Sequence, residues 1–483
     1  MVRGTTVTLQ LRESQQIALT RLLEPDRTFA ALWAEPRSGK TAVSLKLIEH
    51  KAPRVAVVVG PKIAEGVWRG EAAKWLETPY RFHPLTAGNE YPDLSNIGGR
   101  FRGPTQLMFV NYEQFGKQPW QRLRPFLKEL AKLVDYQGMM LLDESHQIKT
   151  PNSVTGRNIR PLASEWQGYR LLITGTPVTN PNQIDAIYGQ WTFVNPAIRE
   201  KWPTARDFRE YFGEWTTVKG YPELVRPIRQ AELNAYIQND VVTMVGPGAP
   251  VPIEKVYYRV PANVLAAHKD LLKKGVVKYK DGTFYNYKED VTGAREIIGL
   301  NPLTRLLRMR TLVGGWLKDD EGQSFSVAPA ARSRLSALGR VLAKCDGKVI
   351  IACTHLHEVR LVRRYLHIKG IGHTIITGST KHKNNVIEAF QQDRELRVLL
   401  VQPRTVAMAV DISVANDLIW YTSDFNYVTF KQASDRIKLS PKSPTVWFLC
   451  GRGTVDEDVW ATLQEDHNHL TKVVRSIRRK NFR

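Results

Sequence analysis

The chain has 483 residues, and 42% of them are hydrophobic, which is enough to build more than one sizeable core. Its 69 lysines and arginines exceed its 47 aspartates and glutamates, and the formal net charge of +22 favours a polyanionic partner, above all nucleic acid. No apolar run approaches the ~20 residues of a membrane-spanning helix and no signal-peptide pattern is present, so we expect no membrane partner and a cytoplasmic location. The three cysteines are widely separated and predict neither a disulfide framework nor a zinc site.

The first candidate site is a loop between a strand and a helix. Residues 29–33 form a buried apolar run, and residues 34–41 read Ala-Glu-Pro-Arg-Ser-Gly-Lys-Thr before a helical pattern begins. This loop matches the Walker A phosphate-binding pattern, except that Ala34 replaces its first glycine. Lys40 would reach the β- and γ-phosphates of a nucleotide, and the Thr41 hydroxyl would bind Mg²⁺. The residues predicted to hold the nucleotide are Ser38, Gly39, Lys40 and Thr41.

Four further apolar runs read as strands that alternate with helices, at residues 55–59, 107–110, 139–142 and 170–173. This alternation predicts a parallel sheet with helices on both faces. Ligands of such sheets bind beyond the carboxyl ends of the strands. The polar residues that follow each run are therefore the candidates for function.

Two carboxylates and a histidine follow the third of these runs, in the sequence Asp143-Glu144-Ser145-His146. Asp143 is suited to hold Mg²⁺, directly or through water, and Glu144 to deprotonate the water that attacks a γ-phosphate. Alone, these residues are equally compatible with a solvated strand end. The loop upstream supplies the lysine and threonine that such a site needs, and it favours a nucleotide hydrolase. We predict Glu144, Asp143 and Lys40 as catalytic residues, and Thr41 and Asp143 as Mg²⁺ ligands.

The second half of the chain repeats the strand and helix pattern, with strands predicted at 348–353, 373–377, 398–401, 418–421 and 445–450. Residues 246–252, Gly-Pro-Gly-Ala-Pro-Val-Pro, mark the boundary between the halves. We predict a first lobe at 1–245 with its core at about 1–197 and a helical extension. A linker with a helical and hairpin protrusion follows at 246–330, and a second lobe with a basic tail at 331–483.

Four segments of the first half carry extended motifs. Residues 143–151 resemble Asp-Glu-x-His-x-x-Lys-Asn, and residues 172–180 resemble Leu-Thr-Gly-Thr-Pro-x-x-Asn. Residues 60–75 resemble Ala-Pro-Lys followed by Asn-Trp, Glu and Trp, and residues 11–15 resemble Leu-Arg-Pro-x-Gln. Together they resemble the Swi/Snf-type DNA translocases, a branch of the superfamily-2 helicase-type ATPases. The resemblance implies that Gln15 reads the adenine.

The second half resembles the same family less closely. Residues 432–442 resemble Gln-Ala-x-Gly-Arg-x-x-Arg-x-Gly-Gln, which implies a nucleotide contact for Gln432 and a catalytic role for Arg436. The second arginine of the motif falls on Leu439. An arginine finger is worth ~10³–10⁵ in the rate of phosphoryl transfer, so its loss implies slow turnover unless a neighbouring cation compensates. The candidates are Arg436, Lys438 and Lys442. Residues 407–411 also replace a glycine-rich loop of the family.

The resemblance implies an α/β fold with two RecA-like lobes, whose parallel sheets are flanked by helices, and helical and hairpin insertions between the lobes. It implies an ATP- and Mg²⁺-dependent DNA translocase or helicase that moves on or remodels duplex or branched DNA, with RNA left open as a track. His146 would couple the nucleotide site to the moving lobe. Thr174 and Thr176 would link the γ-phosphate site to the nucleic-acid face; the alternative is that their hydroxyls cap a strand end in a turn.

The loosened second motif supports a different hypothesis, a degenerate ATPase that acts as an ATP-gated nucleic-acid-binding module. We expect a monomer. The compact chain indicates a phage or mobile-element member, which would place it in the cytoplasm of a host cell.

Basic and aromatic residues alternate in segment 268–287, a pattern typical of contact with nucleic acid. Residues 277–285 predict a hairpin that turns at Asp-Gly, with Lys278, Lys280 and Tyr285 as candidate DNA contacts. A solvated hairpin that packs its own rings is the equal alternative. Arg305 and Arg308 lie on a predicted helix, as a phosphate-facing stripe or as ordinary snorkelling arginines. The basic tail 472–483 predicts affinity that is independent of base sequence and falls with salt.

Overall fold

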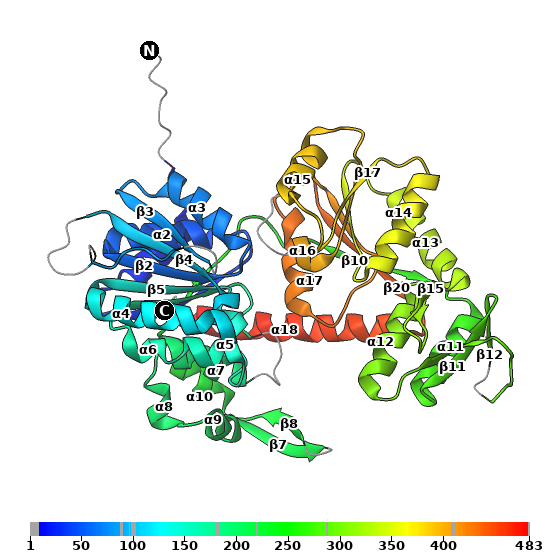
Figure 1. Ribbon diagram of the computed structural model, residues 1–483, viewed down its shortest axis with the longest axis horizontal. Helices are drawn as coiled ribbons and strands as arrows, with labels where there is room; N and C mark the ends of the chain where they lie inside the picture. Colours follow the sequence, from blue (N-terminus) through cyan, green and yellow to red (C-terminus); the bar gives the residue numbers. More distant parts are fainter. Residues whose placement is uncertain are drawn as a thin grey trace, which may run out of the picture. The chain divides into compact units, whose positions relative to one another are not determined.

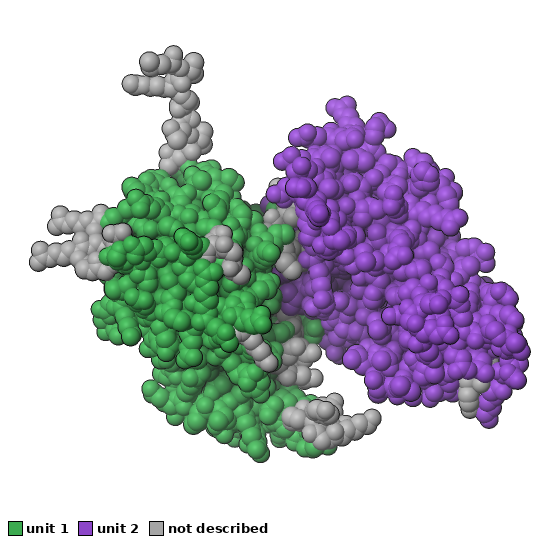
Figure 2. Space-filling model, in the orientation of Figure 1, with its two compact units in different colours: residues 1–247, 466–483 green, residues 248–465 purple. Residues whose placement is uncertain are grey.

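The computed structural model describes residues 9–86, 90–95, 97, 103–178, 184–218, 221–285, 288–406 and 412–481. The chain forms two compact units (Figure 2). Unit 1 comprises Met1–Pro247 together with Asp466–Arg483, and unit 2 comprises Gly248–Glu465. The division thus falls inside the Pro/Gly-rich connector. Residues 466–483, which the sequence analysis grouped with the second lobe, belong to unit 1.

The sheet of unit 1 has seven parallel strands in the order β3-β4-β2-β5-β6-β1-β9. Five of them correspond to predicted strands: β1 (Phe29–Ala34), β2 (Val55–Gly60), β4 (Thr105–Asn111), β5 (Gly138–Asp143) and β6 (Tyr169–Thr174). The edge strands β3 (Tyr80–Leu85) and β9 (Val241–Met244) were not predicted. The strand β3 carries polar residues and Pro84, which weaken the apolar signal. The strand β9 is mostly buried but has only 4 residues, too few for a clear pattern.

Both faces of this sheet are buried, as the continuous apolar runs predict. Val57 packs into one core while its neighbours Ala56 and Val58 pack into the other, because successive strand residues point to opposite faces. One core is completed by α1 (Glu13–Leu22), α2 (Lys40–Lys51) and α3 (Ala64–Trp75). The other is completed by α4 (Lys117–Val134), α5 (Val154–Ile159), α6 (Leu162–Glu165) and α7 (Asp185–Val194) (Figure 1).

A helical extension of unit 1 follows α7. It contains α8 (Ile198–Lys201), α9 (Ala205–Phe212), α10 (Gln230–Ile237) and the ribbon of β7 (Gly213–Val218) and β8 (Tyr221–Pro227). Trp202 packs against three aromatic rings of these helices. The distances between ring centroids are 5.2 Å to Phe208, 5.0 Å to Phe212 and 5.2 Å to Tyr236. The extension therefore has an aromatic core continuous with one of the two cores of the sheet.

The sheet of unit 2 has six parallel strands in the order β10-β20-β19-β16-β18-β17. All five predicted strands are present: β16 (Val349–Ala352), β17 (His373–Ile376), β18 (Val398–Val401), β19 (Asp417–Trp420) and β20 (Thr445–Gly451). The sixth, β10 (Ile253–Tyr258), comes from the segment that the sequence analysis assigned to linker and protrusion. The accompanying helices are α13 (Ala328–Leu342), α14 (Leu356–Ile368), α15 (Lys383–Gln392), α16 (Pro403–Val406) and α17 (Tyr427–Ser434). A further helix, α18 (Val455–Asn481), begins in unit 2, and its residues from Asp466 onward belong to unit 1.

An insertion lies between β10 and α13. It holds α11 (Ala262–Lys273), β11 (Val276–Lys280), β12 (Thr283–Tyr285), β13 (Arg295–Ile298), α12 (Pro302–Val313), β14 (Trp316–Lys318) and β15 (Ser324–Ser326). The predicted hairpin is confirmed, because Lys280 pairs with Thr283 across Asp281 and Gly282. Both turn residues have positive φ, 48° and 87°, as a two-residue hairpin turn requires. The two parallel sheets and these insertions confirm the predicted fold class.

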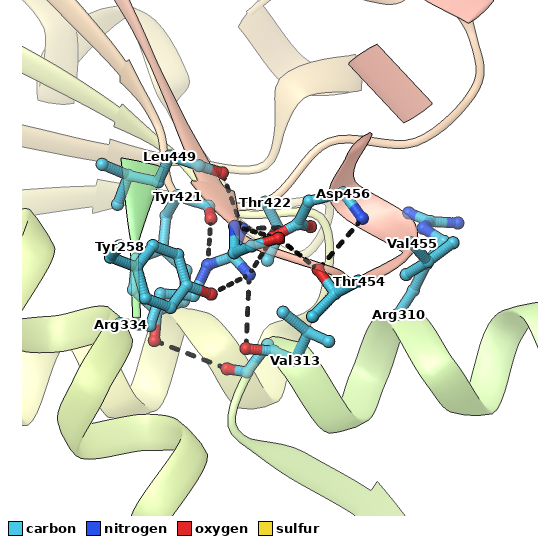
Figure 3. A network of polar contacts seen from close by, with 12 residues as sticks. Tyr258, Arg310, Val313, Arg334, Tyr421, Thr422, Leu449, Thr454, Val455 and Asp456 are labelled. Atoms are coloured by element: carbon cyan, nitrogen blue, oxygen red, sulfur yellow. Dashed lines mark hydrogen bonds and ion pairs between the residues drawn. The ribbon is translucent and has the colours of Figure 1, made fainter. Parts of the chain in front are cut away.

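A buried arginine joins several elements of unit 2 (Figure 3). Arg334 on α13 is 1% exposed, and its guanidinium donates to Asp456 Oδ2 at 3.0 Å and to the Tyr258 hydroxyl at 2.9 Å. Its backbone acceptors are the carbonyl oxygens of Tyr421 at 2.6 Å, Leu449 at 3.2 Å and Val313 at 3.2 Å. These partners belong to or adjoin β10, β19, β20, α12 and α18. We call this group the Arg334 cluster.

Across the parts of the chain that the structure describes, no helix combines the length and the apolar character needed to cross a bilayer.

Candidate active site

The loop between β1 and α2 holds its glycine in a conformation that other residues rarely adopt. Gly39 has φ +82° and precedes Lys40, the first residue of α2. A Cβ at Gly39 would lie 2.2 Å from Gln15 Nε2, so the close approach of that side chain also requires glycine. Gly39 has no side chain that could cap the helix, so an anion at the N-terminus of α2 would meet the backbone and not a capping side chain.

Gln15 holds this loop through its backbone. Its buried amide donates from Nε2 to the Ser38 carbonyl at 3.0 Å, and its Oε1 accepts from the Arg12 N–H at 2.8 Å. The Arg12 guanidinium donates to the same Ser38 carbonyl at 2.6 Å. The Ser38 hydroxyl is buried and has no hydrogen-bond partner among the described residues. The structure thus brings the predicted residues Gln15, Ser38, Gly39 and Lys40 together, and Thr41 follows on α2.

Asp143, the last residue of β5, has both carboxylate oxygens held. Trp68 Nε1 donates to its Oδ2 at 3.0 Å, and the Glu144 N–H donates to its Oδ1 at 3.0 Å. Its backbone carbonyl accepts from the Tyr112 hydroxyl at 2.8 Å. Burial raises the pKa of Asp143. The Lys40 ammonium, whose Nζ lies 3.8 Å from Oδ1, opposes this rise without cancelling it.

Glu144 adopts a left-handed conformation, φ 53°, which is uncommon for a residue with a side chain. Its carboxylate pairs with Lys40, and its Oε2 lies 3.4 Å from His146 Nδ1. Burial would raise the pKa of Glu144, but Lys40 and the hydrogen bond with His146 outweigh it and hold the pKa below its usual range. Glu144 is therefore a carboxylate at neutral pH.

His146 connects this carboxylate to the end of β6. Its Nδ1 lies 3.3 Å from Thr174 Oγ1, and that hydroxyl accepts from the Thr176 N–H at 3.1 Å. Thr174 and Thr176 are buried, and Thr176 Oγ1 has no hydrogen-bond partner among the described residues. The contact between Thr174 and Thr176 is a strand-end turn, as the structural alternative expected. The same turn also reaches His146, as the coupling hypothesis requires.

Gln190 on α7 was not predicted, although it makes a second bridge between the same two segments. Its buried amide accepts from Ser145 Oγ at 2.8 Å and donates to the Pro177 carbonyl at 3.0 Å. It also donates to the Ala186 carbonyl one turn earlier, at 3.0 Å. The available signal was a single amide within the largely apolar helix 185–194.

The two site residues predicted from the motif at 432–442 lie in unit 2. Gln432 is on α17, and Arg436 lies in the 3₁₀ turn Asp435–Ile437 that follows it. Both side chains are half-buried. Leu439 is 42% exposed, so the position of the second arginine offers an apolar side chain. Residues 179–180, 286–287 and 407–411 of the family motifs and the basic segment lie outside the described residues.

Three of the candidate DNA contacts have internal partners. Lys278 Nζ donates to the Glu289 carbonyl at 3.0 Å, and Lys280 Nζ to the Thr292 carbonyl at 2.8 Å. Arg305 donates to the carbonyls of Gly299 at 3.0 Å and Leu272 at 3.3 Å. Tyr285 and Arg308 are half-buried. These contacts support the structural alternative for the hairpin, and a DNA contact there stays a prediction.

Two domain families match the chain. The SNF2-related domain matches residues 32–256, and the helicase conserved C-terminal domain matches residues 333–438. The first match begins within β1 and covers the loop, β5 and β6. The second ends two residues beyond Arg436.

Two relatives and one solved structure are similar to the chain over most of its length. The ISWI chromatin-remodeling complex ATPase ISW1 of Saccharomyces cerevisiae is 23% identical over 420 residues, 82% of this chain and 34% of the relative. The DNA repair and recombination protein RDH54 of the same species is 20% identical over 440 residues, 83% of this chain and 43% of the relative. The chain spans less than half the length of these two relatives. The Sulfolobus solfataricus SWI2/SNF2 ATPase core in complex with dsDNA is 17% identical, with a TM-score of 0.41, over 98% of this chain and 95% of that one. With the motifs and the two domain matches in agreement, the chain belongs to the SNF2-related branch of the superfamily-2 helicase-type ATPases.

Proposed function

We propose that this protein is an ATP hydrolase that couples turnover to movement on, or remodelling of, duplex or branched DNA. The observation that carries the proposal is in unit 1, where Lys40, at the start of α2, lies against Asp143 and Glu144 at the end of β5. A lysine at a helix N-terminus suits a polyphosphate, and an ionised carboxylate beside it suits a general base. The +22 charge supports DNA as the track, as do the relatives, which are named as a chromatin-remodeling ATPase and a DNA repair and recombination protein.

The present contacts indicate how nucleotide binding would prepare the base. Lys40 pairs with Glu144, so a triphosphate that draws Lys40 onto its β- and γ-oxygens would release the carboxylate. Glu144 would then accept a proton from the attacking water, whose oxygen bonds to the γ-phosphorus as the bond to the β-phosphate oxygen breaks. The products are ADP and inorganic phosphate. His146, 3.4 Å from Glu144, would sense this change.

The site fits a divalent cation that arrives with the nucleotide. Among the described residues no three histidine, cysteine, aspartate or glutamate side chains could hold a metal by themselves, so phosphate oxygens and water would complete the coordination. Asp143, oriented through both oxygens, and Thr41, on the first turn of α2, would hold Mg²⁺. Mg²⁺ would neutralise charge on the transferring phosphate.

Thr174, Thr176 and His146 would carry the state of the γ-phosphate away from the site, through their contacts at the end of β6. Arg436 of unit 2 would complete the site when the lobes close, with Gln432 as a further nucleotide contact. The exposed Leu439 supports the second candidate function, an ATP-gated nucleic-acid-binding module with little turnover.

A panel of nucleic acids tests this proposal. Phosphate release should be measured with single-stranded, duplex and forked DNA and with RNA of equal length. We expect the largest stimulation with duplex or forked DNA, together with ATP-dependent displacement of a third strand from a triplex as evidence of movement. ATP-dependent DNA binding without phosphate release would support the module instead. The cytoplasmic location and the monomeric state stay predictions.

A further inference from the structure

A buried tryptophan contacts the carboxylate that the site would present to a cation. Trp68, on α3, is 1% exposed, and its indole Nε1 donates to Asp143 Oδ2 at 3.0 Å. The body of the ring packs in the core between α3 and the sheet, with Val58 and Phe109 in the same core. The indole has one N–H and accepts nothing, so its single hydrogen bond is made to this carboxylate.

The second oxygen of the same carboxylate is also held, but by a different element. Asp143 Oδ1 accepts the Glu144 N–H at 3.0 Å and lies 3.8 Å from Lys40 Nζ. One oxygen is thus held from the sheet core by α3, and the other by the backbone just beyond the end of β5. With a donor on each oxygen, the plane of the carboxylate is set before any ligand arrives.

We infer that Trp68 is a positioning residue, which orients Asp143 for the divalent cation of the bound nucleotide. The inference rests on the proposed function and adds a residue outside the direct contacts to it. Loss of a hydrogen-bond partner behind a metal ligand typically weakens metal affinity about 10- to 100-fold. A purely structural tryptophan would instead lower the amount of active protein and leave the metal affinity of the remainder unchanged.

The chain offers a matched control on the same helix. Trp75, at the end of α3, also donates its indole N–H to a carboxylate, Glu71 Oε2, at 3.0 Å. This second pair lies within one helix, whereas the described hydrogen bonds to the Asp143 carboxylate come from Trp68 and the Glu144 N–H. The variants Trp68→Phe and Trp75→Phe each keep an aromatic ring and each remove one such hydrogen bond, so they differ in which carboxylate loses its donor.

The test uses Mn²⁺ with ADP and the full chain, with free Mn²⁺ measured by electron paramagnetic resonance. For Trp68→Phe we expect Mn²⁺ affinity of the ADP complex to fall about 10- to 100-fold, with ADP affinity in the absence of metal unchanged. In hydrolysis assays the Mg²⁺ concentration for half-maximal rate should rise by a similar factor, with the rate at saturating Mg²⁺ largely kept. Equal Mn²⁺ affinity in Trp68→Phe and Trp75→Phe overturns the inference. A wild-type protein that binds no Mn²⁺ with ADP overturns the proposed function instead.

A measurement on the wild-type protein covers the case in which Trp68→Phe does not fold. The tryptophan indole groups are labelled with ¹⁵N, and their N–H signals are recorded with and without Mn²⁺ and ADP. Mn²⁺ with ADP should broaden the signal of Trp68, because its Nε1 contacts the proposed ligand directly. The broadened signal should still be present in Trp75→Phe, which shows that it does not belong to Trp75. If every indole N–H signal stays sharp under saturating Mn²⁺ and ADP, no tryptophan lies behind the metal ligand, and the inference fails.

Discussion

The two units each contain a buried group of charges, and the two groups are built in opposite ways. In the Arg334 cluster one guanidinium donates through all three nitrogens, and the Asp456 carboxylate accepts from it and from the Gly451 N–H at 2.9 Å. In unit 1 a single ammonium, Lys40, lies against two carboxylates. Two nearby hydroxyls, those of Ser38 and Thr176, have no hydrogen-bond partner among the described residues.

The difference separates a structural role from a functional one. A buried ion pair whose hydrogen bonds are all made keeps its elements together and has little capacity for anything else. A group with competing carboxylates and unmatched hydroxyls can rearrange around a ligand that brings charge of its own. Lys40 and Glu144 are 21% and 19% exposed, so a ligand can reach them, whereas Arg334 is 1% exposed.

The largest expected loss of stability comes from breaking the Arg334 cluster. Arg334→Met should lower the free energy of unfolding of unit 2 by about 3–5 kcal/mol, because Asp456 would stay buried without its cation. Chemical denaturation followed by circular dichroism would measure it. The control is Arg340→Met, an exposed arginine on the same helix, which should change it by less than about 0.5 kcal/mol. Similar losses in the two variants would contradict the structural role of the cluster.

A smaller loss is expected at the unpredicted bridge in unit 1. Gln190→Leu leaves the Ser145 hydroxyl and the Pro177 carbonyl without their amide partner, at a cost of about 1–3 kcal/mol in unfolding free energy. It should also reduce DNA stimulation of hydrolysis, since Ser145 and Pro177 flank the residues proposed to couple the site. Gln121→Leu, an exposed glutamine on α4, is the control. Unchanged stability and stimulation in Gln190→Leu would remove Gln190 from the account.

Lys40→Met should cost less stability, about 1 kcal/mol, because the site admits water and the released carboxylates can bind protons. Nucleotide binding should nevertheless fall sharply, as measured by equilibrium dialysis with labelled ADP. Lys40→Met should thus lose nucleotide binding with little loss of stability, whereas Arg334→Met should lose stability first. A loss of stability as large as that of Arg334→Met would mean that the Lys40 group is also structural.

The smallest effect concerns pH. His268 Nε2 accepts the Val455 N–H at 3.1 Å, so that nitrogen carries no proton, and burial lowers the pKa of His268 despite Asp456 and Asp458. The unfolded chain therefore binds a proton at His268 more readily than the folded chain does. The stability that neutral His268 contributes is fully present above pH 6.5 and is lost as the pH falls towards and through the lower folded-state pKa. The free energy of unfolding should therefore decrease as the pH is lowered through that window, and it should decrease less steeply in His268→Gln. The exposed His367→Gln is the control; equal slopes in the two variants would contradict the assignment.

Much of the fold and the first half of the site could be predicted from the sequence, because the signals there are local. Buried parallel strands leave continuous apolar runs, and the loop before Lys40 and the residues after β5 form short motifs. The edge strand β10 was missed because its Ile-Glu-Lys-Val-Tyr-Tyr sequence is only partly covered. Key side-chain partners lie far away in sequence, because Asp143 is 75 residues from Trp68, Ser145 is 45 from Gln190 and Asp456 is 122 from Arg334. Such pairs leave no periodic trace.

If the Lys40, Asp143 and Glu144 group hydrolyses ATP, turnover should depend on the Glu144 carboxylate. The most direct measurement is phosphate release by the wild-type protein and by Glu144→Gln, with Mg²⁺ and saturating duplex DNA, alongside ADP binding by both. The account predicts DNA-stimulated release by the wild type, a rate about 10²–10⁴-fold lower in Glu144→Gln, and retained ADP binding in the variant. Equal rates in the two proteins, or no release by the wild type above that of Glu144→Gln, would contradict it.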